Sequence, residues 1–301
     1  MSLLVTGATG TVGAAVLAAL AEQPPSTPVL AAVRDPTAAN EHIGPAVATR
    51  AFDFEDSTTW PAALAGVTTL FLLRPPQLAD VAGTFAPLIK MAATNGVRHI
   101  VFLSVQGADK NAVIPHRRIE KLLLASGLAW TFLRPSYFMQ NLTTTLRADL
   151  LERHRICLPA GRAQFRWADA RDIGRVAATV LRDPPAHAGR AYDITGDELL
   201  DFGTVAALIT RQTSVDVRYE SPNPVRFVWQ QQRAGQALAY ALVLVMLHWL
   251  PRFFAPPPAA DTVRRLTGRP PGTLAEFIDR EVAPLLTGAG LQASGHRNPT
   301  T

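Results

Sequence analysis

The chain has 301 residues, of which 48% are hydrophobic and 18% charged, which is typical of a globular protein and too apolar for a disordered one. The formal net charge is +5, but the basic residues are scattered, whereas a nucleic-acid surface needs them clustered. We therefore expect no nucleic-acid partner. The single cysteine, Cys157, excludes an internal disulfide and is expected to be a small core or strand residue.

Short apolar runs alternate with helical patterns through the first half of the chain. The predicted strands are Leu3–Thr6, Val29–Val33, Ala48–Asp53, Thr68–Leu73, His99–Ser104 and Trp130–Leu133. The predicted helices between them are Val12–Glu22, Thr58–Leu64, Leu78–Thr94 and Arg117–Ala125. Strands separated by crossover helices form βαβ units, which build a parallel sheet covered on both faces. The chain enters its first strand without the regions of a signal peptide, so we expect a cytoplasmic protein.

The alternation loosens after Arg134. We predict a helix over Asp172–Leu181 with Asp172 at its cap, a strand over Ala191–Ile194 and a helix over Phe202–Arg211. Prolines flank a strongly apolar helix at Ala237–Leu250, which is shorter than the roughly 20 residues of a membrane span. We expect a buried or pocket-lining helix there and no membrane span. Contact with a membrane surface is the less favoured alternative.

A glycine-rich turn joins the first strand to the first helix, in the sequence Gly7-Ala8-Thr9-Gly10-Thr11-Val12-Gly13. The first glycine permits a tight turn, the second lets the backbone approach a pyrophosphate, and the third lets the helix pack closely on the sheet. The helix N-terminus favours the negative phosphates. The pattern follows a strand and opens a helix, which is the context that identifies a dinucleotide site. A glycine-rich turn without a ligand is the alternative.

The sequence therefore predicts an α/β fold, a Rossmann-type doubly wound parallel sheet with a smaller, mostly helical C-terminal substrate lobe. We expect a dinucleotide-binding domain over residues 1–155, with its sheet completed by residues 165–195. Residues 156–286 would form the substrate or lid lobe, and residues 287–301 a flexible tail.

The end of the second strand indicates which cofactor is preferred. An NAD site carries an acidic residue there for the ribose hydroxyls, but this chain has Arg34, whose guanidinium can pair with a 2′-phosphate. The next residue, Asp35, could cap the following turn or touch a hydroxyl. Asp53 and Phe54, after the third strand, are placed for adenine contacts or simply end that strand. We therefore predict that NADP(H) is preferred over NAD(H).

The motifs together resemble the NmrA-like branch of the atypical short-chain dehydrogenase/reductase superfamily. The resemblance covers residues 3–285. It rests on GATGTVG (7–13), AVRDP (32–36), HIVFLS (99–104), SGLAWTFLRPSYFMQN (126–141), WADARDIGRVAA (167–178), DITG (193–196) and LTGRPPGTLAEFI (266–278). The resemblance implies one of two functions: an NAD(P)H-dependent reductase of quinones, dyes or azo compounds, or a redox-sensing regulator that binds the cofactor without turnover.

The resemblance also places the catalytic positions. Ser104 matches the superfamily's serine, but Ala112 stands at the usual tyrosine position and His116 at the usual lysine position, and no YxxxK motif occurs in the chain. Glu120 lies one helical turn after His116, so it could orient the imidazole and raise its pKa, which would make His116 a proton donor. The alternative is a surface pair that helps the helix to start.

Further site residues follow from the same resemblance. The turn after the sixth strand would close over the nicotinamide, placing Pro135, Tyr137 and Phe138 there, with Tyr137 a candidate catalytic residue. The loop at Leu73 and Arg74 would cross the cofactor, with Arg74 at a phosphate or in solvent. For Asn141 and Asp172, capping and loop-fastening roles are favoured over catalysis. The aromatic residues of Val225–Leu250 would line the acceptor pocket or be structural; they are Phe227, Trp229, Tyr240 and Trp249.

The leading functional hypothesis is an NADPH-dependent reductase that transfers hydride to a small, flat, apolar acceptor such as a quinone or dye. Reduction of such an acceptor gives a delocalised anion that water can protonate, so the missing tyrosine would matter little. A nicotinamide-redox sensor and a redox-neutral enzyme that retains bound NADP are the alternatives. We predict no metal, and the sequence leaves monomer and homodimer open.

Overall fold

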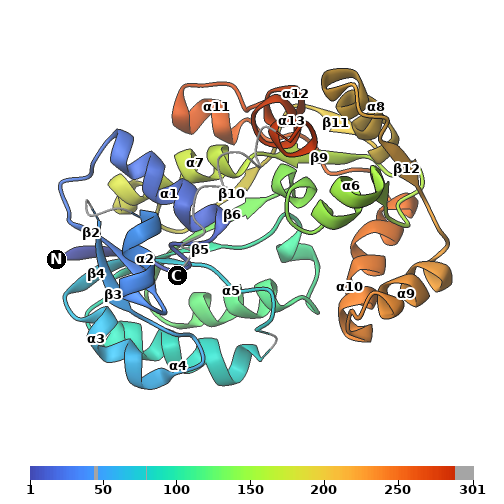
Figure 1. Cartoon of the computed structure of the whole chain (residues 1–301). Coiled ribbons are helices and arrows are strands. Elements are labelled where there is room, and N and C mark those ends of the chain that lie inside the picture. The colour runs from blue at the N-terminus through green and yellow to red at the C-terminus, as the bar shows by residue number, and fades with distance from the viewer. Residues whose placement is uncertain (44–46, 79, 289–301) are drawn as a thin grey trace, which may run out of the picture. The chain divides into compact units, whose positions relative to one another are not determined.

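The computed structural model describes residues 1–43, 47–78 and 80–288, which form two compact units interleaved along the chain (Figure 1). The first unit comprises Met1–Ser136, Ala170–Thr195 and Ala260–Pro271, and the second comprises Tyr137–Asp169, Gly196–Ala259 and the residues from Gly272 onward. The boundary expected at residues 155 and 156 therefore differs from the observed division, in which the chain passes between the units several times. Residues 289–301 of the expected tail lie outside the described residues.

The first unit is built on a seven-stranded parallel sheet in the order β10-β6-β5-β4-β1-β2-β3, which confirms the predicted Rossmann-type fold. Its strands are β1 Ser2–Val5, β2 Val29–Val33, β3 Ala48–Ala51, β4 Val67–Leu72, β5 His99–Leu103, β6 Ala129–Pro135 and β10 Arg190–Ile194. The prediction placed the end of β3 two residues too late. Strand order reverses beside β1, and in such sheets ligands bind outside the carboxyl ends of the strands at this switch point.

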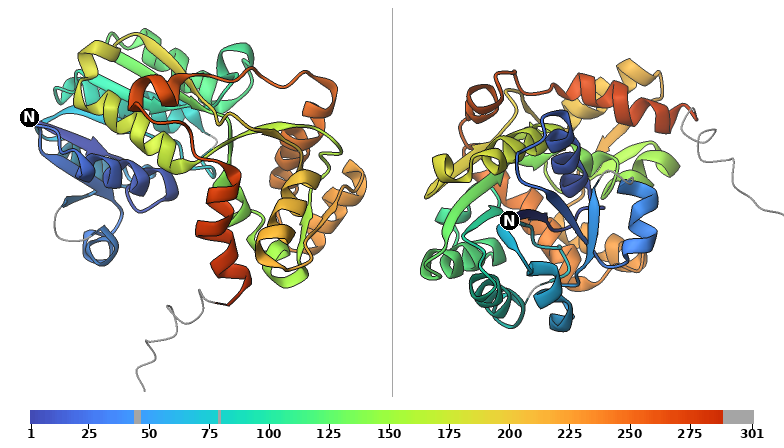
Figure 2. Two further views of the ribbon diagram at one scale, coloured as in Figure 1. Left: turned by 90° about the horizontal axis from the view of Figure 1, so that it is seen from above. Right: turned by 90° about the vertical axis from the view of Figure 1, so that its left-hand side faces the viewer.

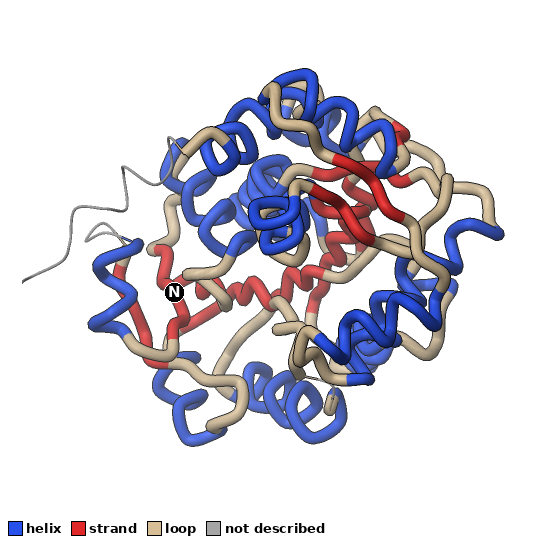
Figure 3. The backbone as a smooth tube through the Cα atoms, turned by 45° about the vertical axis from the view of Figure 1, so that its right-hand side comes forward, coloured by secondary structure: helices blue, strands red, loops and turns tan. Residues whose placement is uncertain are grey.

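Helices cover both faces of this sheet (Figures 2 and 3). They are α1 Thr11–Glu22, α2 Pro36–Ile43, α3 Trp60–Leu64, α4 Val81–Thr94, α5 Pro115–Ala125, α7 Ala170–Arg182 and α11 Thr262–Thr267. Side chains of α3, α4 and α5 form one apolar core with the strands, including Phe85, Ile119 and Leu123. On α7, a Cβ at Gly174 would lie 2.4 Å from the Ala15 carbonyl oxygen, so α1 and α7 pack at backbone distance. This contact explains why residues 170–182 belong to the first unit.

The second unit combines helices with two small sheets. Strands β7 Tyr137–Phe138, β9 Phe165–Ala168 and β11 Leu199–Leu200 form one sheet, and β8 Arg155–Cys157 pairs with β12 Arg218–Glu220 in the other. Its helices are α6 Arg147–Arg153, α8 Phe202–Thr213, α9 Pro224–Arg233, α10 Leu238–Trp249, α12 Leu274–Phe277 and α13 Ala283–Leu286. The fully buried Trp167, Phe202, Phe227 and Phe277 belong to its core. The sequence patterns predicted none of these strands, which are two to four residues long.

For the apolar helix α10, a buried or pocket-lining position was predicted, and the structure shows that it is not a buried helix. Only Ala241, Leu244 and His248 of α10 are buried, whereas Leu242, Leu247 and several neighbours are exposed. Within the described residues, no helix has the length and apolar character needed to cross a membrane. Cys157 is buried on β8 as expected, and burial raises the pKa of its thiol to about 11.

Candidate active site

The glycine turn between β1 and α1 is tightly packed at Gly7 and Gly13 and less so at Gly10. Gly7 has φ +61°, in the left-handed region that favours glycine, and a Cβ there would lie 2.5 Å from Leu73 Cδ2. A Cβ at Gly13 would lie 2.1 Å from the Gly7 carbonyl oxygen, so only glycine fits. At Gly10 the nearest atom to a Cβ is that same oxygen at 3.3 Å. A Cβ at Gly10 would therefore press on the backbone of the turn itself and would meet no other atom within 4 Å.

The rest of the turn is available to an anion. Thr9 and Thr11 are exposed, whereas Val12 turns into the core at 9% exposure. Helix α1 begins after Gly10 without a side-chain cap and without an acidic residue in its first turn. The first amides of a helix need acceptors and its dipole favours negative charge, so this end of α1 suits a phosphate group.

Arg34 and Asp35 follow β2 and have different surroundings. Asp35 Oδ1 accepts hydrogen bonds from the amides of Thr37 and Ala38, at 2.8 and 3.1 Å. Asp35 therefore caps the start of α2, which is one of the two roles expected for it. Arg34 is exposed and forms no ion pair or hydrogen bond with any residue in the described part of the chain. Its guanidinium is free at the carboxyl edge of the sheet.

The residues after β3 and β4 are held largely by their own loops. The Asp53 carboxylate accepts the Glu55 amide at 3.0 Å, and Phe54 packs on Phe52 with ring centroids 4.9 Å apart. Leu73 donates its amide to Thr6 Oγ1 at 3.1 Å. Arg74 Nη1 donates to the carbonyl oxygens of residues 75, 76 and 78, which fastens the loop, and burial lowers the pKa of Arg74. A phosphate contact of Arg74 stays a prediction.

A buried carboxylate, Glu120 on α5, forms a network that the sequence analysis did not predict. Ser104 Oγ donates to Glu120 Oε1 at 2.7 Å. Arg134 donates to both carboxylate oxygens, at 2.9 and 3.0 Å, and Arg117 donates to Oε2 at 3.1 Å. Burial alone would lower the pKa of Arg134, but Glu120, with Asp109 and Asp193 nearby, raises it. The network fixes the Ser104 hydroxyl at the end of β5.

His116 differs from both of its expected roles. The Glu120 carboxylate bonds Ser104, Arg134 and Arg117, and no hydrogen bond joins it to His116. The imidazole packs on Phe102 instead, with ring centroids 6.2 Å apart. Burial, with the charge of Arg74, lowers the pKa of His116 to about 4, whereas a raised value was predicted. His116 is therefore neutral at pH 7, and the alternative of a surface pair is also wrong because Glu120 is fully buried.

Tyr137 lies among aromatic side chains of the second unit. Its ring contacts Phe165, Trp167 and Phe202, at centroid distances of 5.2, 4.9 and 5.7 Å. Its hydroxyl lies 3.1 Å from His248 Nε2, and His248 Nδ1 lies 2.7 Å from the Leu244 carbonyl oxygen. Nδ1 must carry the hydrogen in the neutral ring, so the Tyr137 hydroxyl donates to Nε2. Burial raises the pKa of Tyr137, which makes it a poor acid.

The remaining candidates have structural partners. Asn141 forms a side-chain hydrogen bond with Tyr137, and Asp172 pairs with Arg175 in the first turn of α7. Asp172 is not the cap, because α7 begins at Ala170. Pro135 ends β6 in the first unit, and Phe138 lies on β7 in the second. A position of Pro135, Tyr137 and Phe138 at the nicotinamide stays a prediction.

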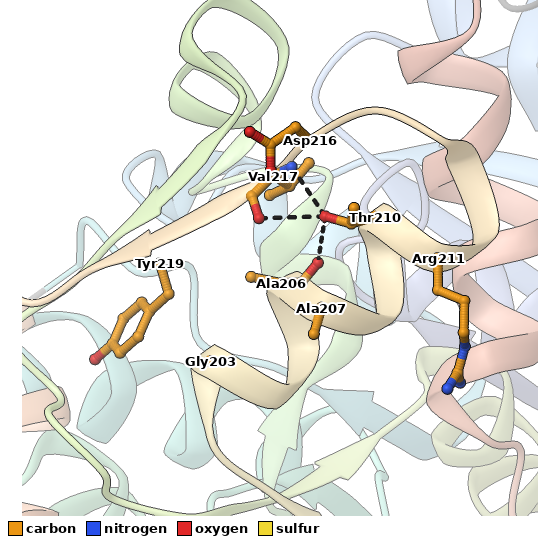
Figure 4. Close-up of a pocket in the computed structure, with 8 residues that line it drawn as sticks. All are labelled: Gly203, Ala206, Ala207, Thr210, Arg211, Asp216, Val217 and Tyr219. Carbon is orange, nitrogen blue, oxygen red and sulfur yellow. Dashed lines mark hydrogen bonds between the residues drawn. The ribbon is translucent and has the colours of Figure 1, made fainter.

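A hollow on α8 and β12 does not provide a competing site (Figure 4). Thr210 Oγ1 in its wall donates to the Ala206 carbonyl oxygen at 3.0 Å and accepts the Val217 amide at 2.9 Å. Among the residues the structure describes, no group of three or more His, Cys, Asp or Glu side chains could hold a metal ion.

Residues 1–242 match the model of the NmrA-like family. The chain belongs to the NmrA-like family. An NAD(P)H azoreductase from Xenophilus azovorans is 35% identical over 289 residues, which cover 93% of this NmrA-like chain and 98% of the relative. Quinone oxidoreductase 2 from Escherichia coli is 27% identical over 280 residues, covering 92% and 97%.

Two solved structures have a similar fold. The Escherichia coli quinone oxidoreductase QOR2 complexed with NADPH has a TM-score of 0.81 at 27% identity and covers 92% of this chain and 99% of its own. The Citrobacter triphenylmethane reductase complexed with NADP(H) has a TM-score of 0.79 and covers 93% and 100%, but its 23% identity shows the fold alone. The match to the family model confirms the family resemblance drawn from the sequence motifs.

Proposed function

We propose that this chain is an NADPH-dependent reductase whose acceptor is a small, flat, conjugated molecule such as a quinone or azo dye. The observation that carries the proposal is the free guanidinium of Arg34 at the same sheet edge as the Gly7–Gly13 turn and the uncapped start of α1. Two relatives are named as an azoreductase and a quinone oxidoreductase, and one structural neighbour is a quinone oxidoreductase with NADPH bound. These names support the reaction class.

The described residues fit a dinucleotide. The turn at Gly10 and the uncapped start of α1 would hold the pyrophosphate, and Arg34 would hold the 2′-phosphate. Asp35 does not compete with the phosphate for Arg34, because its carboxylate is bonded to the amides that open α2. When bound, a reduced nicotinamide supplies two electrons and a proton as hydride.

Among the described residues, none at the superfamily's catalytic positions is suited to donate a proton. Ala112 occupies the position of the superfamily's tyrosine, His116 is neutral at pH 7, and the Ser104 hydroxyl is committed to Glu120. A quinone or azo group reduced by hydride becomes an anion that is delocalised or readily protonated by water, so it needs no protein acid. The chain would then accelerate the reaction mainly by holding the two reactants together. Conjugated acceptors are therefore favoured over simple ketones, whose alkoxide products require a proton donor.

The test is NADPH oxidation, followed at 340 nm, against a panel of quinones, azo dyes, enones, imines and simple ketones. We expect turnover with quinones or azo dyes and little with ketones. The rate with a quinone should be nearly flat between pH 6 and 8, because His116 does not titrate there. His116→Gln should leave that profile unchanged, whereas a profile that loses a step near pH 6.5 in the variant would show that His116 donates the proton after all.

A second candidate, a nicotinamide-redox sensor, is favoured by the same lack of a proton donor. Isothermal titration with NADPH and NADP⁺ separates the two. No turnover across the panel, together with binding that depends on the redox state of the cofactor, would replace the reductase with a sensor. Tightly retained NADP⁺ without net oxidation of NADPH would instead indicate a redox-neutral enzyme.

A further inference from the structure

The second unit carries an unusual concentration of exposed apolar side chains on α9, α10 and the 3-10 turn Leu250–Phe253. Of the 14 large hydrophobic residues that are exposed in the described part of the chain, 11 lie between residues 225 and 254. We call this set the apolar face; it comprises Val225, Trp229, Leu238, Tyr240, Leu242, Val243, Met246, Leu247, Leu250, Phe253 and Phe254. Contiguous exposed patches of this kind mark interaction sites.

Helix α10 contributes most of the apolar face, because its solvent-exposed side carries apolar residues instead of polar ones. Ala241, Leu244 and His248 lie on one side of the helix and are buried. The opposite side of a surface helix normally carries polar residues, but on α10 it carries Leu242, Val243, Met246 and Leu247, which are 39–52% exposed. No charged residue occurs between Arg233 and Arg252. Helices α9 and α10 pack on each other, so the exposed side belongs to a helical hairpin (Figure 1).

The segment that carries the apolar face holds basic residues and no acidic ones. Residues 221–260 contain Arg226, Arg233 and Arg252 and no aspartate or glutamate. A hollow of about 530 Å³ at the edge of the face is lined by Arg162, Arg252 and Phe254 among others, and the Arg252 guanidinium lies against Gly161. None of these four arginines forms an ion pair with a carboxylate of the described chain. The face therefore combines apolar surface with arginines that are not held in ion pairs, while Asp201 and Glu220 lie on neighbouring elements, near side chains that Arg252 and Arg226 also reach.

This combination distinguishes between two possible occupants. A symmetric dimer would bring the same patch of both copies together, and this segment offers no carboxylate to pair with the arginines of the other copy. An anionic lipid surface offers negative headgroups for the arginines and an apolar layer for the leucine and phenylalanine side chains. Trp229 and Tyr240 are of the types enriched at that depth.

We propose that the apolar face docks on an anionic membrane surface, with α10 lying in the plane of the headgroups. Helix α10 has 12 residues and is therefore about 18 Å long, which suits a helix that lies on a membrane and not one that crosses it. The arginines at the edges of the face contact lipid phosphates and carboxylates. This proposal concerns binding and does not depend on the proposed reductase activity.

The apolar contribution is tested by flotation of the full-length protein with vesicles of phosphatidylcholine, with or without phosphatidylserine. The wild type should float with the vesicles that contain phosphatidylserine and not with phosphatidylcholine alone. Leu242→Gln with Leu247→Gln should weaken that binding at least about tenfold, because each substitution removes apolar surface from the lipid contact. The matched control, Val113→Gln with Leu124→Gln, changes two exposed apolar residues of the first unit and should bind as the wild type does.

The charge contribution is tested separately. Arg226→Gln with Arg252→Gln should weaken binding roughly tenfold or more, since each arginine near an anionic surface contributes favourably. Arg98→Gln with Arg190→Gln removes the same charge elsewhere and should have little effect. Absence of vesicle binding by the wild type would overturn the proposal. So would self-association, measured by analytical ultracentrifugation without lipid, that the leucine variant abolishes, because the face would then join two copies of the chain.

Discussion

Arg34 offers the sharpest test of the cofactor site, because its substitution should change binding without changing the fold. The side chain is exposed, follows β2 and has no ion-pair partner among the described residues. Replacing it with glutamine leaves no buried group unsatisfied, so we expect the free energy of unfolding to change by less than about 0.5 kcal/mol. Any loss of affinity can then be attributed to the lost contact with the cofactor.

The magnitude follows from the exposure of the guanidinium. A charge-assisted hydrogen bond contributes about 1.5–3 kcal/mol, and solvent and salt screen an exposed group, so the lower end applies. A loss of about 1.5 kcal/mol corresponds to roughly a tenfold increase in the Kd for NADPH. NADH carries no 2′-phosphate, so its Kd should change less than about twofold.

The assay is titration of wild type and Arg34→Gln with both cofactors at one ionic strength, followed by calorimetry or by reduced-nicotinamide fluorescence. Arg98→Gln is the matched control, because Arg98 is also exposed but precedes β5 at the opposite edge of the sheet. It should change neither affinity. If Arg34→Gln weakens NADPH and NADH equally, or weakens neither, the assignment of Arg34 to the 2′-phosphate is refuted.

Three further predictions concern the glycine turn, the buried carboxylate and the buried histidines. Gly10→Val should abolish NADPH binding while the circular dichroism spectrum stays that of the folded protein. Gly13→Ala should instead lower the Tm, because its Cβ would lie 2.1 Å from a carbonyl oxygen. Unchanged NADPH affinity in folded Gly10→Val would contradict the phosphate site. Glu120→Gln should reduce the free energy of urea unfolding by about 3 kcal/mol, since the neutral amide removes the buried charge to which Arg134 and Arg117 donate and leaves only the half-exposed Asp109 paired with Arg134. Asp216→Asn, in an exposed pair, should leave the free energy of unfolding nearly unchanged. Burial lowers the pKa values of His99, His116 and His248 to about 4. Below pH 6.5, the histidine pKa of the unfolded chain, the unfolded state therefore binds more protons than the folded state. The free energy of unfolding should then fall as the pH drops from about 6.5 to 4. Between pH 7 and 5 the loss should be roughly 2 kcal/mol for each histidine, and urea midpoints that stay level would show that these rings are accessible to protons.

The glycine turn and the strands of the first unit could be predicted because their signals are local. A buried parallel strand needs only a short apolar run between turn residues. The range predicted for β2, Val29–Val33, is the range that the structure shows. The phosphate turn depends on three glycines within seven positions, each required by the backbone next to it. The short strands of the second unit gave no such signal, because two to four residues cannot show a periodicity.

The catalytic positions show the opposite case. Spacing along α5 correctly placed His116 and Glu120 one turn apart, but it could not reveal that Ser104, Arg134 and Arg117 would bind the carboxylate. Two of these partners come from the ends of neighbouring strands, β5 and β6. The pKa of His116 moves downward because burial and Arg74 act on it without help from Glu120. Both effects are set by residues distant in sequence.

Sequence by itself determined the family, the parallel sheet, the phosphate turn and the arginine after β2, since each depends on residues close together in the chain. Tertiary structure alone decided which side of α10 is covered, where the Glu120 carboxylate points and that the two units interleave. Apolar residues all around α10 predicted burial because the hydrophobic effect favours it. Whether a side chain is in fact removed from water depends on what packs against it, and residues on other elements determine that.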